Sequence, residues 1–543
     1  AVVGGVFWLG AVGAVAGVDT WQAEELLHAL ERKEFVRRER RSSVADDGEY
    51  AFQHLLVRDV AYGEIPRAAR AAKHARAAAW IESLGRAEDH AESVAHHYLS
   101  ALELARAAGN DASGFEEHAR RAFRNAGDRA SALFTYGVAL EFYESALQLW
   151  PVDDPERGEL IFRSAEAGFH LDRRFEPLVE ARDALLADGN SERAAETETL
   201  LALAVYFQDD DKRALEHAAQ AAAMVQATPP SRTKTFVLAN QARLLAVTDH
   251  EEDAIPIGRE ALALAEELAL YDLWANALNT IGMARVGLDD FGGLEDLEGS
   301  LRLALEHCSP FELGRIYNNL GWAYVAAGRV REACEMFETR LANARHYGMQ
   351  TDARWGALML CANSFLLGDW DTTLRLADEL LADPLARQWH DGALMLRATV
   401  RLGRNELPGA RADVQRALEF DAAEQDVDSR ARMLAIGVRV ALATDRRGEA
   451  EALAGELQDV LNEVDPHAFV WPHELFEVAA ALDELGLPLD PLAAIAAGHP
   501  ERVWHRAADA LARGAILDAA EILASAGAET YAAHFRLRGA QTL

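Results

Sequence analysis

The stretch from Gly314 to Tyr347 reads GRIYNNLGWAYVAAGRVREACEMFETRLANARHY and has the pattern of two antiparallel helices joined by a tight turn. Gly328 marks the turn, because a residue without a Cβ adopts positive φ at little cost. Gly321 and Ala333 are small residues at the places where the two helices approach most closely. Larger apolar residues fill the seam beside them: Leu320, Tyr324 and Phe337. One such hairpin cannot bury its apolar face alone, so the stretch predicts neighbouring hairpins.

The spacing of these residues resembles the tetratricopeptide repeat (TPR), a helix–turn–helix of about 34 residues with the pattern W-x2-L-G-x2-Y…A-x3-F…P. One position departs from it, since Arg340 stands three residues after Phe337, where the family has a small side chain. A second good match runs from Ala126 to Pro151, and weaker matches continue to about residue 425. We therefore expect an all-α fold in which residues 101–543 form one continuous TPR-type solenoid ending in capping helices.

Composition limits the partners and the location of the chain. It has 543 residues, of which half are hydrophobic and a quarter charged, and a net charge of −34. Ala and Leu dominate, which favours helix over sheet. So acidic a chain argues against nucleic acid as a partner, because phosphate binding needs clustered Lys and Arg. The cysteines are odd in number and far apart, which predicts no disulfide framework and fits a reducing cytoplasm: Cys308, Cys334 and Cys361.

Residues 1–18, AVVGGVFWLGAVGAVAGV, carry no charge, which raises the alternatives of a membrane span and a signal peptide. No basic residue precedes this run, and Asp19 follows it without a positive cluster. Its five glycines weaken an isolated helix. We expect instead a buried, truncated apolar helical segment and no membrane partner. Because the chain begins at Ala1 without Met, we expect it to be a fragment of a longer protein.

Residues 19–100 differ in composition from the rest of the chain. The segment from Arg32 to Arg76 holds eleven Lys and Arg against seven Asp and Glu, which makes it a basic island in an acidic chain. The expected elements are a helix over 22–30, strands over 34–38 and 49–52, and helices over 54–62 and 67–81. Helix, short β-hairpin and helix in this order are the outline of a winged-helix domain.

The basic island and the helix after it resemble the winged-helix segment of bacterial STAND-type signalling ATPases. The segment includes ERKEFVRRE from Glu31 and YAFQHLLVRDVAYGEIPRAARAAKHARAAAWIE from Tyr50. The residues that carry the resemblance are Phe52, His54, Val57, Arg58, Asp59, Ala61, Tyr62 and His74. It is most similar to large proteins that join a class III adenylate/guanylate cyclase domain to an AAA-like ATPase and a C-terminal TPR array. Similar segments occur in large ATP-binding transcriptional regulators.

This resemblance implies a role for one histidine. In STAND proteins the winged helix closes over a nucleotide held by an upstream P-loop, and a histidine of that domain often lies against the phosphates. Phe52-Gln53-His54-Leu55 takes the matching place, although it differs from the Met-His-Asp form. The resemblance thus implies that His54 senses nucleotide, that an upstream ATPase domain is a partner, and that ATP or ADP binds in the longer parent. Taken alone, a histidine at a strand–helix junction is more often a capping or packing residue.

The chain itself contains no catalytic motif. It has no G-x-x-x-x-G-K-[ST], no Gly-Lys pair and no G-x-S-x-G, so we expect no enzyme activity and no cofactor in this chain. His90, Glu92, His96 and His97 lie close in sequence, but adjacent histidines do not share a helix face. We interpret them as packed or solvated side chains and expect no metal site.

The concave face of a TPR solenoid is lined by the first helix of each hairpin. Counted from the Leu-Gly landmark of the repeat, which is Leu320-Gly321 in the best match, the side chains expected there are Asn276, Asn279, Arg315, Asn318 and Trp322. Asn can hydrogen-bond a peptide backbone, and Arg can hold a carboxylate. The pattern predicts a site for a protein or peptide ligand. The alternative is a groove that is solvated or filled by another part of the same protein.

Together these features predict the regulatory and sensing region of a multidomain signal-transduction ATPase, of the cyclase-linked kind, whose solenoid binds a protein or peptide. One alternative is a stand-alone TPR scaffold without a nucleotide switch. Another is the C-terminal region of a large ATP-binding transcriptional regulator.

Overall fold

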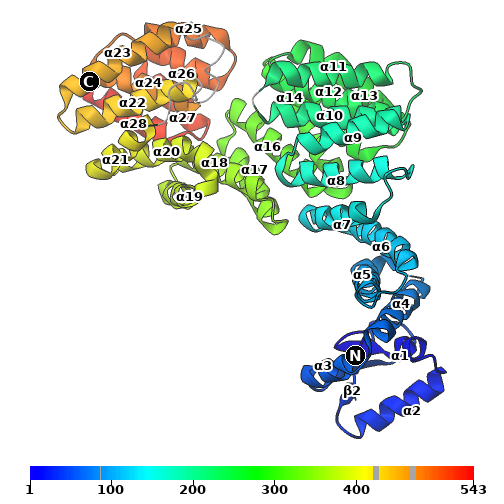
Figure 1. Ribbon diagram of the computed structural model, residues 1–543. Helices are drawn as coiled ribbons and strands as arrows, with labels where there is room; N and C mark the ends of the chain where they lie inside the picture. The colour runs from blue at the N-terminus through cyan, green and yellow to red at the C-terminus, as the bar shows by residue number, and fades with distance from the viewer. Residues whose placement is uncertain (86, 209, 420–426, 464–471, 543) are drawn as a thin grey trace. The chain divides into compact units, whose positions relative to one another are not determined.

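The computed structural model describes residues 1–85, 87–208, 210–419, 427–463 and 472–542. In these ranges the chain consists of α-helices α1 to α28, two short 3-10 helices and a small sheet (Figure 1). It is an all-α fold of TPR-type helical hairpins, as the sequence predicts. The chain forms two compact units, residues 1–225 and 226–543, and this boundary falls inside the repeats. The division into residues 1–18, 19–100 and 101–543 stays a prediction.

Unit 1, residues 1–225, begins with a three-stranded antiparallel sheet. The strand order is β1 (Val6–Trp8), β3 (Glu49–Phe52) and β2 (Val36–Arg38). Helices α1 (Leu9–Ala16) and α2 (Thr20–Glu31) connect β1 to β2. A small core of inward side chains joins the sheet to these helices: Phe7, Leu9, Ala23, Leu27, Val36 and Tyr50.

The first 18 residues differ from the single helical segment that the sequence predicts. Val6–Trp8 form a strand, and the helix begins only at Leu9. Phe7 stacks on Tyr50 of β3 with ring centroids 6.2 Å apart, and Gly4 has a φ of 152°, which no helix contains. Burial in this small core is the physical reason for the apolar run. Among the described residues, none of the helices has both the length and the apolar character that a membrane span requires.

The first helix after the sheet, α3 (Leu55–Gly63), packs against β3. The helices that follow it in unit 1 pack as antiparallel pairs: α4 (Arg67–Ser83), α5 (Ala91–Ala107), α6 (Ser113–Ala132), α7 (Tyr136–Leu149), α8 (Arg157–Asp172), α9 (Glu176–Ala187), α10 (Ser191–Tyr206) and α11 (Asp211–Val225). A 3-10 helix, Ala87–His90, leads into α5. The helices and strands that the sequence predicts between residues 22 and 81 all form, with small shifts at their ends.

Unit 2, residues 226–543, continues with six more hairpins. They are built from α12 (Arg232–Val247), α13 (Glu251–Glu267), α14 (Tyr271–Gly287), α15 (Gly293–His307), α16 (Pro310–Ala326), α17 (Val330–His346), α18 (Gln350–Leu366), α19 (Trp370–Ala382), α20 (His390–Gly403), α21 (Leu407–Leu418), α22 (Val427–Ala443) and α23 (Arg447–Glu463). A second 3-10 helix, Pro384–Trp389, precedes α20.

Glycines allow the two helices of a hairpin to touch. A Cβ added at Gly321 would lie 2.8 Å from the ring of Phe337, so a larger residue does not fit opposite that ring. A Cβ on Gly282 would lie 2.7 Å from the carbonyl oxygen of Gly293, and one on Gly293 would lie 2.4 Å from that of Gly282. The Gly292-Gly293 pair, which fits the repeat pattern poorly, therefore starts a close contact between α14 and α15 rather than breaking the hairpin.

The C-terminal helices do not extend the stack of hairpins. They are α24 (Pro472–Leu485), α25 (Asp490–Gly498), α26 (Val503–Ala512), α27 (Ile516–Ser525) and α28 (Glu529–Thr542), and Figure 1 shows them in orange and red beside α18 to α22. Trp504 Nε1 donates a hydrogen bond to the carbonyl oxygen of Val325 near the end of α16 (2.8 Å). Trp370 Nε1, at the start of α19, donates to Thr530 Oγ1 (2.9 Å).

A third contact ties these helices to an earlier hairpin. Arg502 Nε donates to Asp289 Oδ1 (2.6 Å) in the turn between α14 and α15. The C-terminal helices thus dock on the turns of three successive hairpins, α14–α15, α16–α17 and α18–α19. The polar composition of residues 530–539 suggests a solvent-facing cap, but α28 buries Tyr531 and Phe535 in the core of unit 2. One of its polar groups is hydrogen-bonded inside the core, where Tyr531 Oη donates to Glu477 Oε1 of α24 (3.0 Å).

Candidate functional site

The five groove residues expected from the sequence lie on two neighbouring helices of unit 2. Asn276 and Asn279 are on α14, and Arg315, Asn318 and Trp322 are on α16, which packs beside α14. Residues three, four and seven apart share one face of a helix, so each helix presents its members together. We call these five residues the inner strip.

The two asparagines of the inner strip are buried and incompletely hydrogen-bonded. Asn276 is 5% exposed and Asn279 0% exposed. Asn276 Oδ1 and both side-chain polar atoms of Asn279 have no hydrogen-bond partner among the described residues. A buried polar group without a partner costs about 1–3 kcal/mol. Such groups are rare in a well-packed core, and an ordered water, an ion or a functional role accounts for them in other proteins.

Arg315 has a similar surplus of donors. Its Nε donates to Glu312 Oε2 one turn earlier on α16 (3.0 Å), while its Nη2 is buried without a partner in the described structure. Glu312 Oε1 also lies 3.9 Å from Arg243 Nη1 of α12. One carboxylate therefore faces two guanidinium groups.

Asn318 differs from the two asparagines on α14. Its Oδ1 accepts hydrogen bonds from Arg340 Nη1 (2.8 Å) and Trp355 Nε1 (3.0 Å), and its Nδ2 donates to Asn319 Oδ1 (3.3 Å). Asn318 thus holds its neighbours in place. Trp322 is half-buried and packs against the core of unit 2. Among the inner-strip residues, the unpaired buried atoms belong to Asn276, Asn279 and Arg315 in the described structure.

Three residues beside the inner strip were not predicted by counting along the helices: Arg340, Asp352 and Trp355. Arg340 of α17 is 6% exposed, donates from Nη2 to Asp352 Oδ1 (3.1 Å), and leaves its Nε without a partner within the described ranges. Burial lowers the pKa of the Arg340 guanidinium below its usual value, and Asp352 opposes this shift. Trp355 of α18 completes the group through Asn318. The signal that could have found Arg340 is its departure from the small residue of the repeat pattern.

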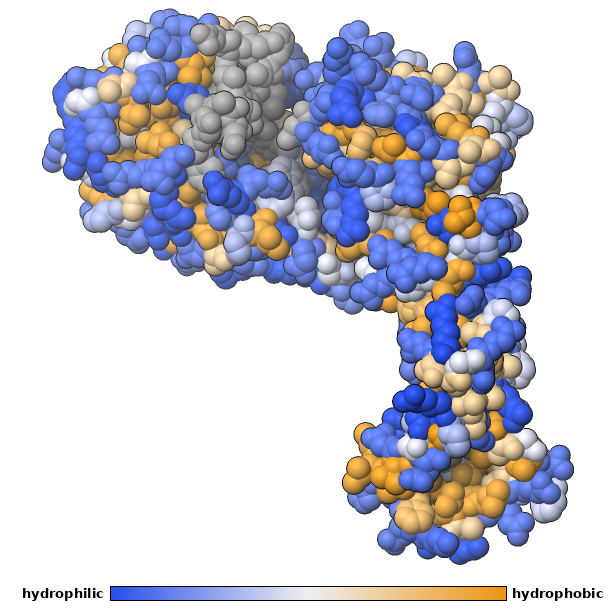
Figure 2. Space-filling view, viewed as in Figure 1, coloured by the Kyte–Doolittle hydropathy of each residue, from blue (hydrophilic) through white to orange (hydrophobic). Residues whose placement is uncertain are grey.

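His54 stands at the N-cap of α3, and its side chain is exposed and makes no capping hydrogen bond. Neither packing nor capping therefore accounts for it. The helix that follows is unusually apolar on its outside, with Leu55, Leu56 and Val60 exposed by 65%, 73% and 59%. Figure 2 shows apolar surface in this part of unit 1. The nucleotide-sensing role of His54 stays a prediction.

A pair of buried histidines lies near α3. His74 Nδ1 is 2.9 Å from His97 Nδ1, and His74 Nε2 is 2.9 Å from Tyr62 Oη. Both rings are 3% exposed, and burial lowers the pKa of His74 to about 3 and that of His97 to about 4. In the part of the chain that the structure describes, no three His, Cys, Asp or Glu side chains are arranged to hold a metal ion.

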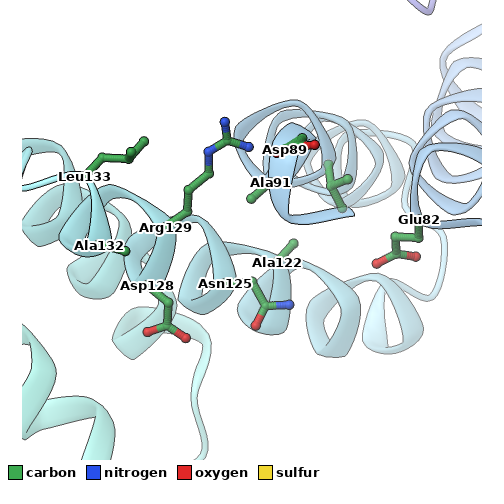
Figure 3. A pocket seen from close by; sticks show the side chains of 10 residues that line it. Glu82, Asp89, Ala91, Ala122, Asn125, Asp128, Arg129, Ala132 and Leu133 are labelled. Carbon is green, nitrogen blue, oxygen red and sulfur yellow. The ribbon is translucent and has the colours of Figure 1, made fainter. Parts of the chain in front are cut away.

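A pocket of about 520 Å³ lies in unit 1 against α5 and α6, next to the end of α4 (Figure 3). Its polar lining is mostly acidic, with Glu82, Asp89 and Asp128. Glu82 accepts a hydrogen bond from Tyr98 Oη (2.7 Å), and Asp128 accepts one from Arg163 Nη1 (2.7 Å). These carboxylates already serve the fold, so the pocket offers less unpaired chemistry than the inner strip.

Several solved structures resemble this chain at low sequence identity. No family model and no curated protein matches the chain. A Rap protein complexed with Competence and Sporulation Factor is 14% identical over 64% of this chain and 98% of its own, with a TM-score of 0.44. The quorum sensor NprR from B. thuringiensis, in its apo form, is 12% identical over 64% and 98%, with a TM-score of 0.44.

A third solved structure belongs to a larger protein. It is a Signal Transduction ATPase with Numerous Domains (STAND) protein with a tetratricopeptide repeat sensor from Pyrococcus horikoshii. It is 13% identical over 68% of this chain, with a TM-score of 0.34, and the match spans 59% of its own length.

Proposed function

We propose that this chain is the sensing region of a signalling protein and that its solenoid binds a protein or peptide along the inner strip. The observation that carries the proposal is the set of buried, unpaired atoms on α14 and α16: Asn276 Oδ1, both polar atoms of Asn279, and Arg315 Nη2, none paired within the described residues. A side-chain amide offers a donor and an acceptor together, which matches the N–H and C=O groups of an extended peptide backbone.

The test is capture of peptides from a synthetic array of random sequences by the full chain. The Asn276→Ala/Asn279→Ala double variant is expected to weaken binding of the captured peptides by about tenfold or more, because each lost amide removes hydrogen bonds to the ligand. Asn462→Ala is the matched control, since Asn462 is exposed on α23, outside the inner strip. Equal capture by the double variant and the control would show that the inner strip is not the binding site.

We also propose that the chain belongs to a longer, cytoplasmic STAND-type parent of the cyclase-linked kind, in which an upstream ATPase domain binds ATP or ADP. The sequence resemblance around His54 supports this parent. The order β1-α1-α2-β2-β3 agrees with a winged helix, and the apolar outer face of α3 offers a surface on which an upstream domain could pack.

The parent can be tested at His54 in the full-length protein. His54→Ala is expected to speed the loss of bound nucleotide by about tenfold, because a hydrogen bond to a charged phosphate contributes about 1.5–3 kcal/mol. His28→Ala, on α2, is the control. Unchanged nucleotide retention in His54→Ala would remove this residue from the nucleotide site.

The two alternatives differ in their support. A stand-alone scaffold shares the peptide groove but has no nucleotide to retain, so the His54 test separates it. A large ATP-binding transcriptional regulator that bound DNA through this domain would use the helix directly before the hairpin of β2 and β3. That helix, α2, carries Glu24, Glu25 and Glu31 and no Lys or Arg. These charges oppose DNA phosphates, which disfavours direct DNA binding by this domain.

A further inference from the structure

One edge of unit 1 carries exposed apolar side chains at successive hairpin turns. We call residues 133–138, 169–175 and 206–207 the turn edge, since they lie where α6 turns into α7, α8 into α9 and α10 into α11. Its exposed apolar residues are Leu133 (56%), Val138 (42%), Leu171 (47%) and Phe207 (42%). Leu171 lies close to α7, because a Cβ on Gly137 would be 3.9 Å from its Cδ1. Apolar surface that continues from one element to the next marks a place for an interaction partner.

Ring contacts join the three turns into one surface. Tyr136 of α7 stacks on His170 of α8, with ring centroids 4.6 Å apart and ring planes at 18°. The guanidinium of Arg173 contacts two rings, with Cζ 5.0 Å from the centroid of Phe169 and 4.8 Å from that of Phe207. Because these side chains are already held by their neighbours, a partner that covers them loses little affinity to side-chain ordering.

In unit 2 the corresponding turns are covered by the C-terminal helices. Gly328 lies seven residues after Gly321, at the turn between α16 and α17, and a Cβ there would be 2.7 Å from Val503 Cγ1 of α26. At the next turn, Thr530 Oγ1 of α28 donates to the carbonyl oxygen of Phe365 near the end of α18 (2.5 Å). Helices therefore cover this edge in unit 2, which indicates the kind of element that fits the turns of unit 1.

Unit 1 differs at the residue that allows this close cover. Phe134 lies seven residues after Gly127, in the same register as Gly328, and has a φ of 59°. Glycine adopts this left-handed backbone at little cost, whereas a bulky residue is strained there. The next turn has Arg173 with a φ of 62°. Large side chains thus stand at two turns where they lower stability, which is typical of functional positions.

The pocket of about 520 Å³ adjoins the turn edge and adds negative charge to it. Leu133 belongs to both, and Figure 3 shows it at the opposite end of the pocket from Glu82. Glu82 accepts its hydrogen bond from Tyr98, and burial raises the pKa of that phenol, so the bond leaves the carboxylate charge in place. Among the described residues of the lining, carboxylates outnumber guanidinium groups. This end of the surface therefore attracts a cation.

We propose that the turn edge docks an amphipathic helix of a partner protein. The apolar face of that helix covers Leu133, Leu171 and Phe207, and one of its Lys or Arg side chains enters the pocket beside Glu82. Such a side chain suits the pocket, because its aliphatic stem lies along Leu133 while its charge reaches the carboxylates. The turn edge is in unit 1 and the inner strip in unit 2, so this proposal goes beyond the proposed function and does not depend on it.

The probe is a displayed library of short helical peptides, selected on the full chain and then measured singly by fluorescence anisotropy. We expect a group of binders with an apolar stripe and at least one Lys or Arg. Phe134→Gly should weaken this group about tenfold or more, because one aromatic anchor often carries that much of the binding energy. The same substitution suits the positive φ, so the free energy of unfolding should stay the same or rise. Loss of binding is thereby separated from loss of the fold.

A second variant tests the charge. Glu82→Gln keeps an acceptor for Tyr98 Oη but removes the negative charge, so it should weaken the same binders about threefold, as expected for a partly exposed ion pair. Leu305→Ser and Glu306→Gln are the matched apolar and acidic controls, because both residues are exposed on α15 in unit 2. Neither control should change the affinity.

Three outcomes would contradict the proposal. If no selected helix loses affinity in Phe134→Gly, the turn edge is not a docking site. If Leu305→Ser weakens the binders as much as Phe134→Gly does, the chain binds apolar peptides without a specific site. If the binders depend on Phe134 but carry no basic residue, the role of the pocket falls. The Asn276→Ala/Asn279→Ala variant should bind these helices unchanged, so the turn edge and the inner strip are tested separately.

Discussion

At the residue scale, the His74–His97 contact makes unit 1 sensitive to acid. A contact between two Nδ1 atoms needs one donor and one acceptor, so the rings cannot both be protonated and keep it. Burial lowers both pKa values from 6.5 to about 3 for His74 and about 4 for His97, and His96, Arg58 and Arg70 add repulsion at His74. The unfolded chain therefore binds more protons below pH 6.5. The contribution of the two neutral histidines to the free energy of unfolding is therefore fully present above pH 6.5 and is lost as the pH falls below it.

Urea unfolding followed by hydrogen exchange in α4 and α5 measures this effect. Between about pH 6.5 and about pH 5, each histidine is expected to cost about 1.4 kcal/mol per pH unit. His74→Gln should roughly halve the slope of the free energy of unfolding against pH. His28→Gln, on α2, should leave that slope unchanged. A slope that is the same in wild type and His74→Gln would mean that the pair does not titrate on unfolding.

At the element scale, local patterns predict individual helices well. Gly321 and Ala333 are small enough for the two helices to approach closely, and Phe337 fills the space between them. The sequence therefore predicts the hairpin α16–α17 directly. The strand β1 could not, because Val6–Trp8 become a strand through Phe7 packing on Tyr50, which lies more than 40 residues later. The contact of Gly282 with Gly293 could not be predicted either. From the sequence alone, the adjacent glycines Gly292 and Gly293 indicate a helix break, and their role is clear only once the partner helix is known.

The candidate site was predictable only in part, for a similar reason. Counting along a helix assigned Asn276, Asn279, Arg315, Asn318 and Trp322 to one face of their helices, and these helices, α14 and α16, pack beside each other. Counting does not show which atoms are left without partners. Arg340 pairs with Asn318 of the preceding helix and with Asp352 of the next one. That grouping depends on the packing of three helices rather than on the spacing within one.

At the scale of the whole molecule, unit 2 departs from an open solenoid. In an open array each repeat contacts only its neighbours, and its stability is close to a sum of local terms. Here Trp504 of α26 reaches Val325 of α16, 179 residues away, and Thr530 of α28 reaches Trp370, 160 residues away. Contacts of such separation couple the C-terminal helices to the middle hairpins and slow folding, because a long loop must close first.

This closure predicts that damage to a C-terminal helix spreads to hairpins far away in sequence. Trp504 is 0% exposed, so Trp504→Ala should destabilise unit 2 by about 3–5 kcal/mol. Hydrogen–deuterium exchange, followed peptide by peptide, should then rise in α16 and α17 as well as in α26, because the carbonyl of Val325 loses the Trp504 donor, although it still accepts from Gly328 N, and the core between these helices opens. Trp21→Ala is the control for the loss of a tryptophan, because Trp21 is 63% exposed on α2 in unit 1. It should change neither the stability of unit 2 nor the exchange in α16, α17 and α26. Faster exchange confined to α25–α28 would instead mean that these helices form an independent element and that the hairpins are stable without them.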